Sequence, residues 1–175
     1  CLESSAGRVF VLGVPLMGPM IGHPPSAAGA ARAFVVGLLV WWQWSQCTWA
    51  GSAIDLQQRA RTRVLVLSLI PVTLLMTIAI PEAYHSTGVW FAGAYFGVQI
   101  LVLGMHGSFA LLDPVQRPGL VRYTSLAVVA PAVVRAGAFF DGHTREGMWA
   151  VAAAINLIAG LRASSGEWAI NPVHF

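Results

Sequence analysis

The chain has 175 residues, of which 57% are apolar and only 10% are charged. Globular domains in water carry about a quarter charged residues, so this composition favours a protein embedded in the lipid bilayer. The net charge of +3 comes from arginines spread along the chain. A nucleic-acid-binding face needs such residues clustered, so nucleic acid is not expected as a partner.

The first two apolar segments differ in length. Residues 9–22 contain Pro15 and Pro19 and are shorter than the roughly 20 residues that a helix needs to cross the hydrocarbon core. A weak or re-entrant span is therefore expected there. Residues 34–54, within a helix permitted from residue 27, lie between Arg32 and Asp55 and are long enough to cross.

Four more apolar segments follow. Residues 64–81 contain Pro71, which is expected to kink the helix, and residues 89–112 are long enough to cross with some tilt. Residues 123–140 form the fifth segment, and after a loop at 141–147 the last, residues 148–161, is again short. The prediction is an all-α integral membrane bundle of about six transmembrane helices, the first and last short or irregular, in one domain over residues 1–175.

The arginines predict the orientation of these helices. With alternating crossings, one side of the membrane receives only Arg32 and Arg145, and Arg135 lies within a span. Because positive residues favour the cytoplasmic side, the N-terminus is predicted to be cytoplasmic. The cytoplasmic side then receives Arg8, Arg59, Arg61, Arg63, Arg117, Arg122 and Arg162.

Both ends of the chain suggest a longer protein. It begins with Cys1 instead of methionine and stops at His174 and Phe175. We expect the N-terminal half of a longer protein. Its expected partners are the lipid bilayer and either the missing C-terminal half or a second copy of the chain.

Polar residues within the apolar segments are candidates for function, because burying them in a bilayer is costly. They are Gln43, Gln46, Gln99, His106, Arg135 and Asn156. Trp44 would lie about 15 Å from either end of its span, so an interfacial aromatic belt does not explain the tryptophans around it.

Helical spacing places Trp42, Gln46 and Trp49 on one stripe, with Gln43 one turn from Gln46. A small-residue stripe of Ser45, Thr48 and Ser52 suits close helix contact. The tryptophan and glutamine stripe could line a pathway or ligand pocket. Alternatively, the glutamines only join helices by hydrogen bonds and the indoles fill space.

Arg135 and His106 also leave alternatives open. Arg135 could extend to the headgroups or pair with Asp141 or Glu82. His106 could join helices by a hydrogen bond or relay protons. A haem would need a facing axial ligand such as a second histidine, and the other histidines fall in loops, so no cofactor, metal site or catalytic residue is expected.

Several blocks resemble the low temperature requirement protein A family of bacterial membrane proteins. They are AGAARAFVVGLLVWWQW at residues 28–44, the loop at 55–63, AIPEAYHSTGVWFAGAYFGVQI at 79–100, and the terminal pair His174 and Phe175, which matches the start of an HFxER motif. Gly7 stands where the family has an acidic residue, and the rest of HFxER falls beyond Phe175. The resemblance implies a multi-span protein of the bacterial inner membrane that is linked to growth in the cold, with a poorly defined molecular activity.

Passage of a solute or ion through the bundle is the leading functional hypothesis. The candidate pathway residues are Trp42, Gln43, Gln46, Trp49, Gln99, His106 and Arg135. The alternative is a structural or adaptor membrane protein that supports growth in the cold. Enzymatic activity is not expected, since no nucleophile, base and orienting group converge in the sequence.

Overall fold

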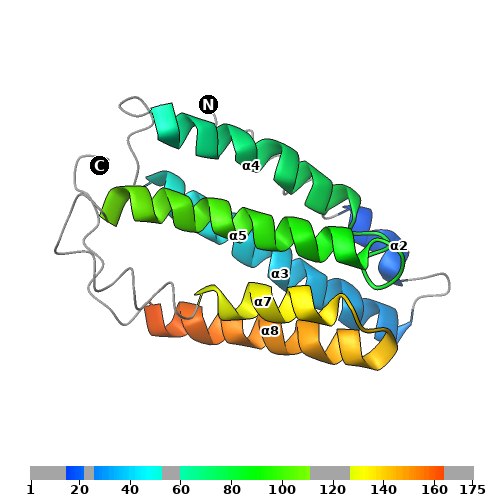
Figure 1. Ribbon diagram of the computed structural model, residues 1–175. Coiled ribbons are helices and arrows are strands. Elements are labelled where there is room, and N and C mark those ends of the chain that lie inside the picture. Colours follow the sequence, from blue (N-terminus) through cyan, green and yellow to red (C-terminus); the bar gives the residue numbers. More distant parts are fainter. Residues whose placement is uncertain (1–14, 22–25, 53–59, 111–126, 164–175) are drawn as a thin grey trace.

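The computed structural model describes residues 15–21, 26–52, 60–110 and 127–163. Within these ranges every regular element is helical (Figure 1), and the predicted all-α class is confirmed. The elements are η1 (Pro15–Met17), α2 (Gly18–Ile21), α3 (Ala27–Ser52), α4 (Ala60–Ile78), α5 (Gly88–Ala110), α7 (Val129–Gly137) and α8 (Gly142–Ala163).

The long helices begin close to where the sequence predicts them. Ser26 caps α3, since its Oγ accepts a hydrogen bond from the backbone N–H of Gly29 at 3.0 Å. Helix α4 continues through Pro71 without ending there. Of the predicted first span, the described part is limited to η1 and the single turn of α2; its other residues lie outside the described ranges.

The start of α8 differs from the prediction. Residues 142–147 were expected in a loop because they are polar, yet they form the first turns of a helix of 22 residues. Gly142 permits the sharp reversal after α7, because its φ of +57° is costly for any residue with a Cβ. The predicted loop and the predicted short last helix are both wrong, because Arg145 and Glu146 find partners in other segments of the fold, as described below.

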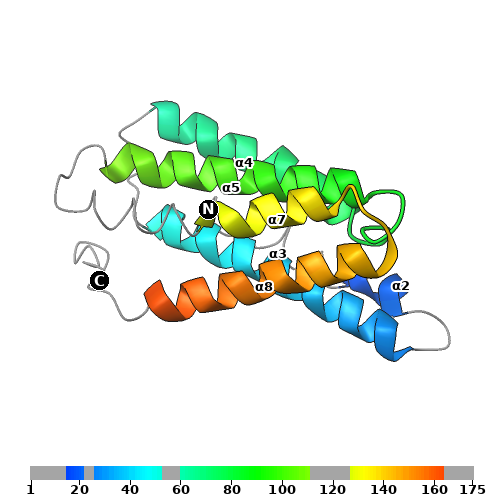
Figure 2. The same cartoon turned by 60° about the horizontal axis from the view of Figure 1, so that its bottom comes forward.

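The helices pack as a bundle, with α5 in contact with α3, α4 and α7, and α8 in contact with α3 and α7. Helix α4 lies on the outer side of α5 (Figures 1 and 2). The main core is formed by fully buried apolar side chains from α3, α5, α7 and α8, among them Val36, Leu39, Phe91, Val134 and Trp149. A second cluster joins α3, α4 and α5 through Ala50, Leu69, Val98, Val102 and Met105.

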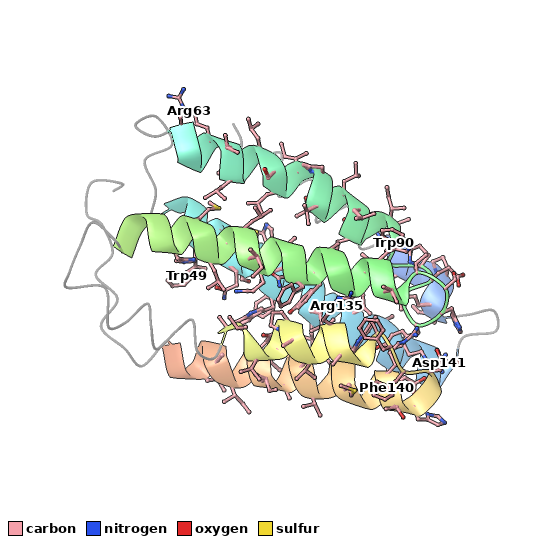
Figure 3. The ribbon with its side chains drawn as sticks, viewed as in Figure 1. Trp49, Arg63, Trp90, Arg135, Phe140 and Asp141 are labelled. Atoms are coloured by element: carbon pink, nitrogen blue, oxygen red, sulfur yellow. The ribbon has the colours of Figure 1, made fainter. Side chains whose placement is uncertain are left out.

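One end of the bundle collects the start of α3, the α4–α5 loop and the α7–α8 turn (Figure 1). These are the connections that the arginine distribution predicts on the same side. Arg63, at the start of α4, lies at the opposite end (Figure 3). The helices therefore alternate in direction as the sequence predicts.

The outer surface of the bundle is apolar. Helix α5 over Gly88–Gly107 is long and apolar enough to cross a membrane, and the apolar part of α4, Arg63–Ile78, is shorter. Among the described residues α5 alone meets that test, so six crossings remain a prediction. Exposed large apolar side chains include Phe34, Trp41, Leu67, Leu74, Leu75, Ile78, Trp90, Ile100, Val151 and Ile158.

Candidate functional site

The middle of the bundle contains a group of buried polar side chains, here named the polar core: Gln43 and Gln46 from α3, Tyr95 and Gln99 from α5, and Asn156 from α8. Spacings of three and four residues place each pair on one face of its helix. Gln43 and Gln99 are 0% and 1% exposed. Buried amides on the facing sides of helices thus lie within an otherwise apolar bundle.

Hydrogen bonds in the polar core join three helices. The amide nitrogen Nε2 of Gln43 donates to Gln99 Oε1 at 3.3 Å and to the backbone carbonyl of Tyr95 at 3.4 Å. Both distances exceed the usual range of about 2.7–3.2 Å, so these bonds are weak. Asn156 Nδ2 donates to the Tyr95 hydroxyl at 2.8 Å, which adds α8 to the same group.

The two facing glutamines leave one acceptor and one donor unused. Gln43 Oε1 and Gln99 Nε2 are buried and have no hydrogen-bond partner among the described residues. Reversing one amide would oppose two oxygens or two nitrogens. Reversing both would bring the Gln43 oxygen against the Tyr95 carbonyl and would still leave one donor and one acceptor. A buried polar group without a partner costs about 1–3 kcal/mol, so a guest molecule that bonds to both would stabilise the site.

The tryptophans separate into buried and outward-facing members. Trp42 is buried, and a Cβ built on Gly160 of α8 would lie 2.9 Å from its Cζ3 atom, so this glycine gives room to the indole. Trp41, Trp44 and Trp49 are 50%, 40% and 60% exposed. The predicted stripe therefore contributes Trp42 and Gln46 to the interior, whereas Trp49 lies on the outer face near the end of α3 (Figure 3).

His106 and Arg135 make other contacts. The ring nitrogen Nδ1 of half-buried His106 is 3.0 Å from the carbonyl of Val102 in its own helix. The guanidinium of Arg135 lies 4.6 Å from the Phe139 ring centroid, a cation–π contact, and its Nη1 is buried with no partner in the described residues. Asp141, a suggested partner of Arg135, instead forms an ion pair with Arg145.

Sequence reasoning missed the role of Arg145, which is only 5% exposed. Its Nε donates to the Phe140 carbonyl at 2.8 Å, and Nη1 donates to the His85 carbonyl at 3.0 Å. Nη2 donates to the Ala138 carbonyl at 3.2 Å and to Asp141 Oδ1 at 3.1 Å. Arg145 thereby ties the α7–α8 turn to the α4–α5 loop, and its only sequence signal was the four-residue spacing from Asp141.

A second charged contact lies at the same end. Arg32 Nη2 is 2.6 Å from Glu146 Oε1, and the Arg32 guanidinium lies 5.9 Å from the Tyr84 ring centroid. Burial and the Glu146 carboxylate both raise the pKa of Tyr84, so this phenol stays neutral. We name Arg32, Tyr84, Arg145 and Glu146 the end network.

Packed aromatic rings connect the end network to the polar core. The ring centroid of Trp149 lies 4.9 Å from that of Tyr84 and 5.2 Å from that of Phe91. Phe91 in turn stacks on Tyr95 at 6.2 Å. The Trp149 indole also donates from Nε1 to the Val134 carbonyl at 3.0 Å. Contacting rings thus lie between the end network and Tyr95 of the polar core.

Glu146 gives the end network a defined pH dependence. Burial raises its pKa, but hydrogen bonds from Arg32 and His143 more than offset this, so the pKa lies below its ordinary value of 4.5. Because the folded-state pKa is depressed, the stabilisation is present above pH 4.5 and is lost as pH falls through the folded-state value. We expect Glu146→Gln to cost less than about 1 kcal/mol at pH 7, since the pair is partly exposed.

Thermal unfolding of the wild type and of Glu146→Gln, in detergent between pH 3 and 7, tests this pH dependence. The difference in melting temperature between wild type and Glu146→Gln should shrink as the pH falls below 4.5. Glu82→Gln, at an exposed position of the same end, serves as the control. A difference that stays constant with pH would contradict the assignment.

Comparison with known proteins adds two matches. The family model described as "Bacterial low temperature requirement A protein" matches residues 9–175. The uncharacterized protein RA0937 of Rhizobium meliloti (strain 1021) is 28% identical over 149 residues, which cover 82% of this chain and 35% of that protein. The chain thus spans about a third of the length of this relative. No solved structure matches the chain significantly.

Proposed function

Because the chain belongs to the bacterial low temperature requirement A family, a family of bacterial membrane proteins, we propose that it forms part of a polar pathway across the inner membrane. In this proposal about six helices cross the bilayer, and the N-terminus is cytoplasmic. The polar core lets a polar solute or ion pass, without catalysis. The remainder of a longer protein, or a second copy, would complete the pathway.

The distribution of side chains supports the placement in a membrane. Large apolar side chains cover much of the outer surface, and several amides are buried inside the apolar core, an arrangement that suits a bilayer better than water. Trp49 and Trp90 are exposed near opposite ends of the bundle (Figure 3), where membrane proteins commonly carry aromatic belts. The excess of arginines that the sequence predicts on one side supports a cytoplasmic N-terminus.

The observation that carries the pathway is the pair of facing glutamines. A polar core that only joined helices would be stabilised by using all its hydrogen-bonding groups. Here Gln43 Oε1 and Gln99 Nε2 are buried and unpartnered among the described residues. A passing solute could form hydrogen bonds with both groups and then leave, because neither group bonds to another described residue.

Solute flux into liposomes tests this proposal. Full-length protein should raise the flux of at least one polar solute above that of empty liposomes, and Gln43→Leu should lower it about tenfold, since a lost hydrogen bond of about 1.4 kcal/mol has that effect. Thr73→Val is the matched control, because the Thr73 hydroxyl is buried but bonds to the Leu69 carbonyl of its own helix. Flux at the level of empty liposomes for a broad solute panel would refute the pathway.

A structural or adaptor role is the second candidate, since close packing also joins the helices, as where Trp42 of α3 lies against Gly160 of α8. It predicts that Gln43→Leu leaves growth in the cold intact. It also predicts that Gly160→Leu abolishes that growth by displacing Trp42. The pathway predicts that Gln43→Leu already impairs growth in the cold.

A further inference from the structure

We propose that the guest of the polar core is a small uncharged molecule that both donates and accepts hydrogen bonds, and that ions are excluded. This inference rests on the proposed pathway and names the class of solute that it would take. The bonding pattern of Gln43 and Gln99 carries it, together with the uncharged character of the residues around them.

The facing amides require a guest with both kinds of hydrogen-bonding group. Gln43 Oε1 needs a donor, and Gln99 Nε2 needs an acceptor. If both amides were reversed, the two glutamines would exchange these roles and the requirement on the guest would not change. A hydroxyl group, a urea or a primary amide satisfies it, and so does water.

The same pair disfavours an ion of either sign. A cation at this point would be repelled by the N–H groups of Gln99, and an anion would be repelled by the side-chain carbonyl oxygen of Gln43. A cation such as Ca²⁺ takes six to eight oxygen ligands, whereas the pair offers one spare acceptor. Moving an ion out of water costs several kcal/mol even after the protein relaxes, and this pair has no charged group that would offset that cost.

The polar core contains no ionisable acid or base other than a phenol, because it consists of three glutamines, one asparagine and Tyr95. Arg32 and Arg145 are engaged at the end network. Arg135 faces Phe139, and His106 bonds to its own helix. Each of these four basic residues thus has a contact other than the facing amides, and the polar core offers hydrogen bonds in place of charge.

Permeability measurements on full-length protein in liposomes separate the possible guests. Stopped-flow light scattering reports entry of water, glycerol and urea, and entrapped dyes report K⁺ and Cl⁻. We expect at least one uncharged molecule to enter about tenfold faster than into empty liposomes, with K⁺ and Cl⁻ at background. Acceleration of water alone would identify water as the guest, and acceleration of glycerol or urea would identify a larger one.

Gln99→Met, an unbranched side chain without hydrogen-bonding groups, should return that permeability to background, while Thr73→Val leaves it unchanged. Gln43→Met provides a second test if Gln99→Met does not elute as a single species in size-exclusion chromatography. K⁺ or Cl⁻ flux that depends on Gln99, with uncharged molecules at background, would overturn this inference and leave the pathway standing. Uncharged flux that is unaffected by the methionine variants would also overturn it, and no flux of any kind would overturn both proposals.

Discussion

Replacing Arg145 with alanine is expected to lower the free energy of unfolding by about 3–5 kcal/mol, because it removes a buried guanidinium and the several hydrogen bonds that this group donates. The carbonyls of Phe140, Ala138 and His85 would lose their charged donor. Each buried acceptor left without a partner costs about 1–3 kcal/mol. The α7–α8 turn and the α4–α5 loop would then no longer be held together.

Denaturant or thermal unfolding in detergent, followed by circular dichroism, measures this loss. Thr144→Ala is the control, since Thr144 is the exposed neighbour on the same helix and should change stability little. Arg145→Lys should fall between wild type and alanine, because an ammonium keeps the charge but not the planar fork that reaches several carbonyls. Equal stabilities for Arg145→Ala and Thr144→Ala would contradict the role given to this residue.

Trp149→Ala is expected to cost a similar amount, about 3–5 kcal/mol, as for other large-to-small changes of buried aromatic residues. The indole is 0% exposed and lies between the rings of Tyr84 and Phe91. A Cβ on Gly137 would lie 2.9 Å from Trp149 Cδ1, so the fold leaves this space for the indole. Removing the side chain would leave a cavity and an unpartnered Val134 carbonyl.

Trp90→Ala is the matched control for this loss, because the Trp90 side chain is 63% exposed on the outer face. Trp149→Phe should cost less than alanine, since it keeps most of the ring volume and loses the hydrogen bond to Val134. Thermal unfolding should therefore rank Trp149→Ala lowest, Trp149→Phe next and Trp90→Ala nearest to wild type. A loss for Trp90→Ala equal to that for Trp149→Ala would contradict the packing described.

The elements best predicted from the sequence are the long apolar helices. Helices α3 and α5 begin within a residue of their predicted starts, since a long apolar run between polar breaks is readable without tertiary information. The start of α8 was not predictable in this way. Its first two turns contain Thr144, Arg145 and Glu146, which resemble a loop until the partners of Arg145 and Glu146 in other segments are known.

The polar core was predictable only in part. Gln43, Gln46, Gln99 and Asn156 stand out because amides are unusual within apolar segments. Tyr95 was missed, because an aromatic residue in an apolar helix gives no signal of a buried hydroxyl that bonds to Asn156. Helical spacing placed Trp42 and Trp49 on one stripe, but it could not tell that the neighbouring helices cover only Trp42.

A high-resolution cryo-electron microscopy map of the full-length protein in lipid nanodiscs tests the central claim most directly. The claim is that Gln43 and Gln99 face each other with a donor and an acceptor left for a guest. We predict density for a bound molecule within hydrogen-bonding distance of Gln43 Oε1 and Gln99 Nε2 in their observed orientations. Side chains repacked so that protein groups satisfy both amides, with no density between them, would contradict the account.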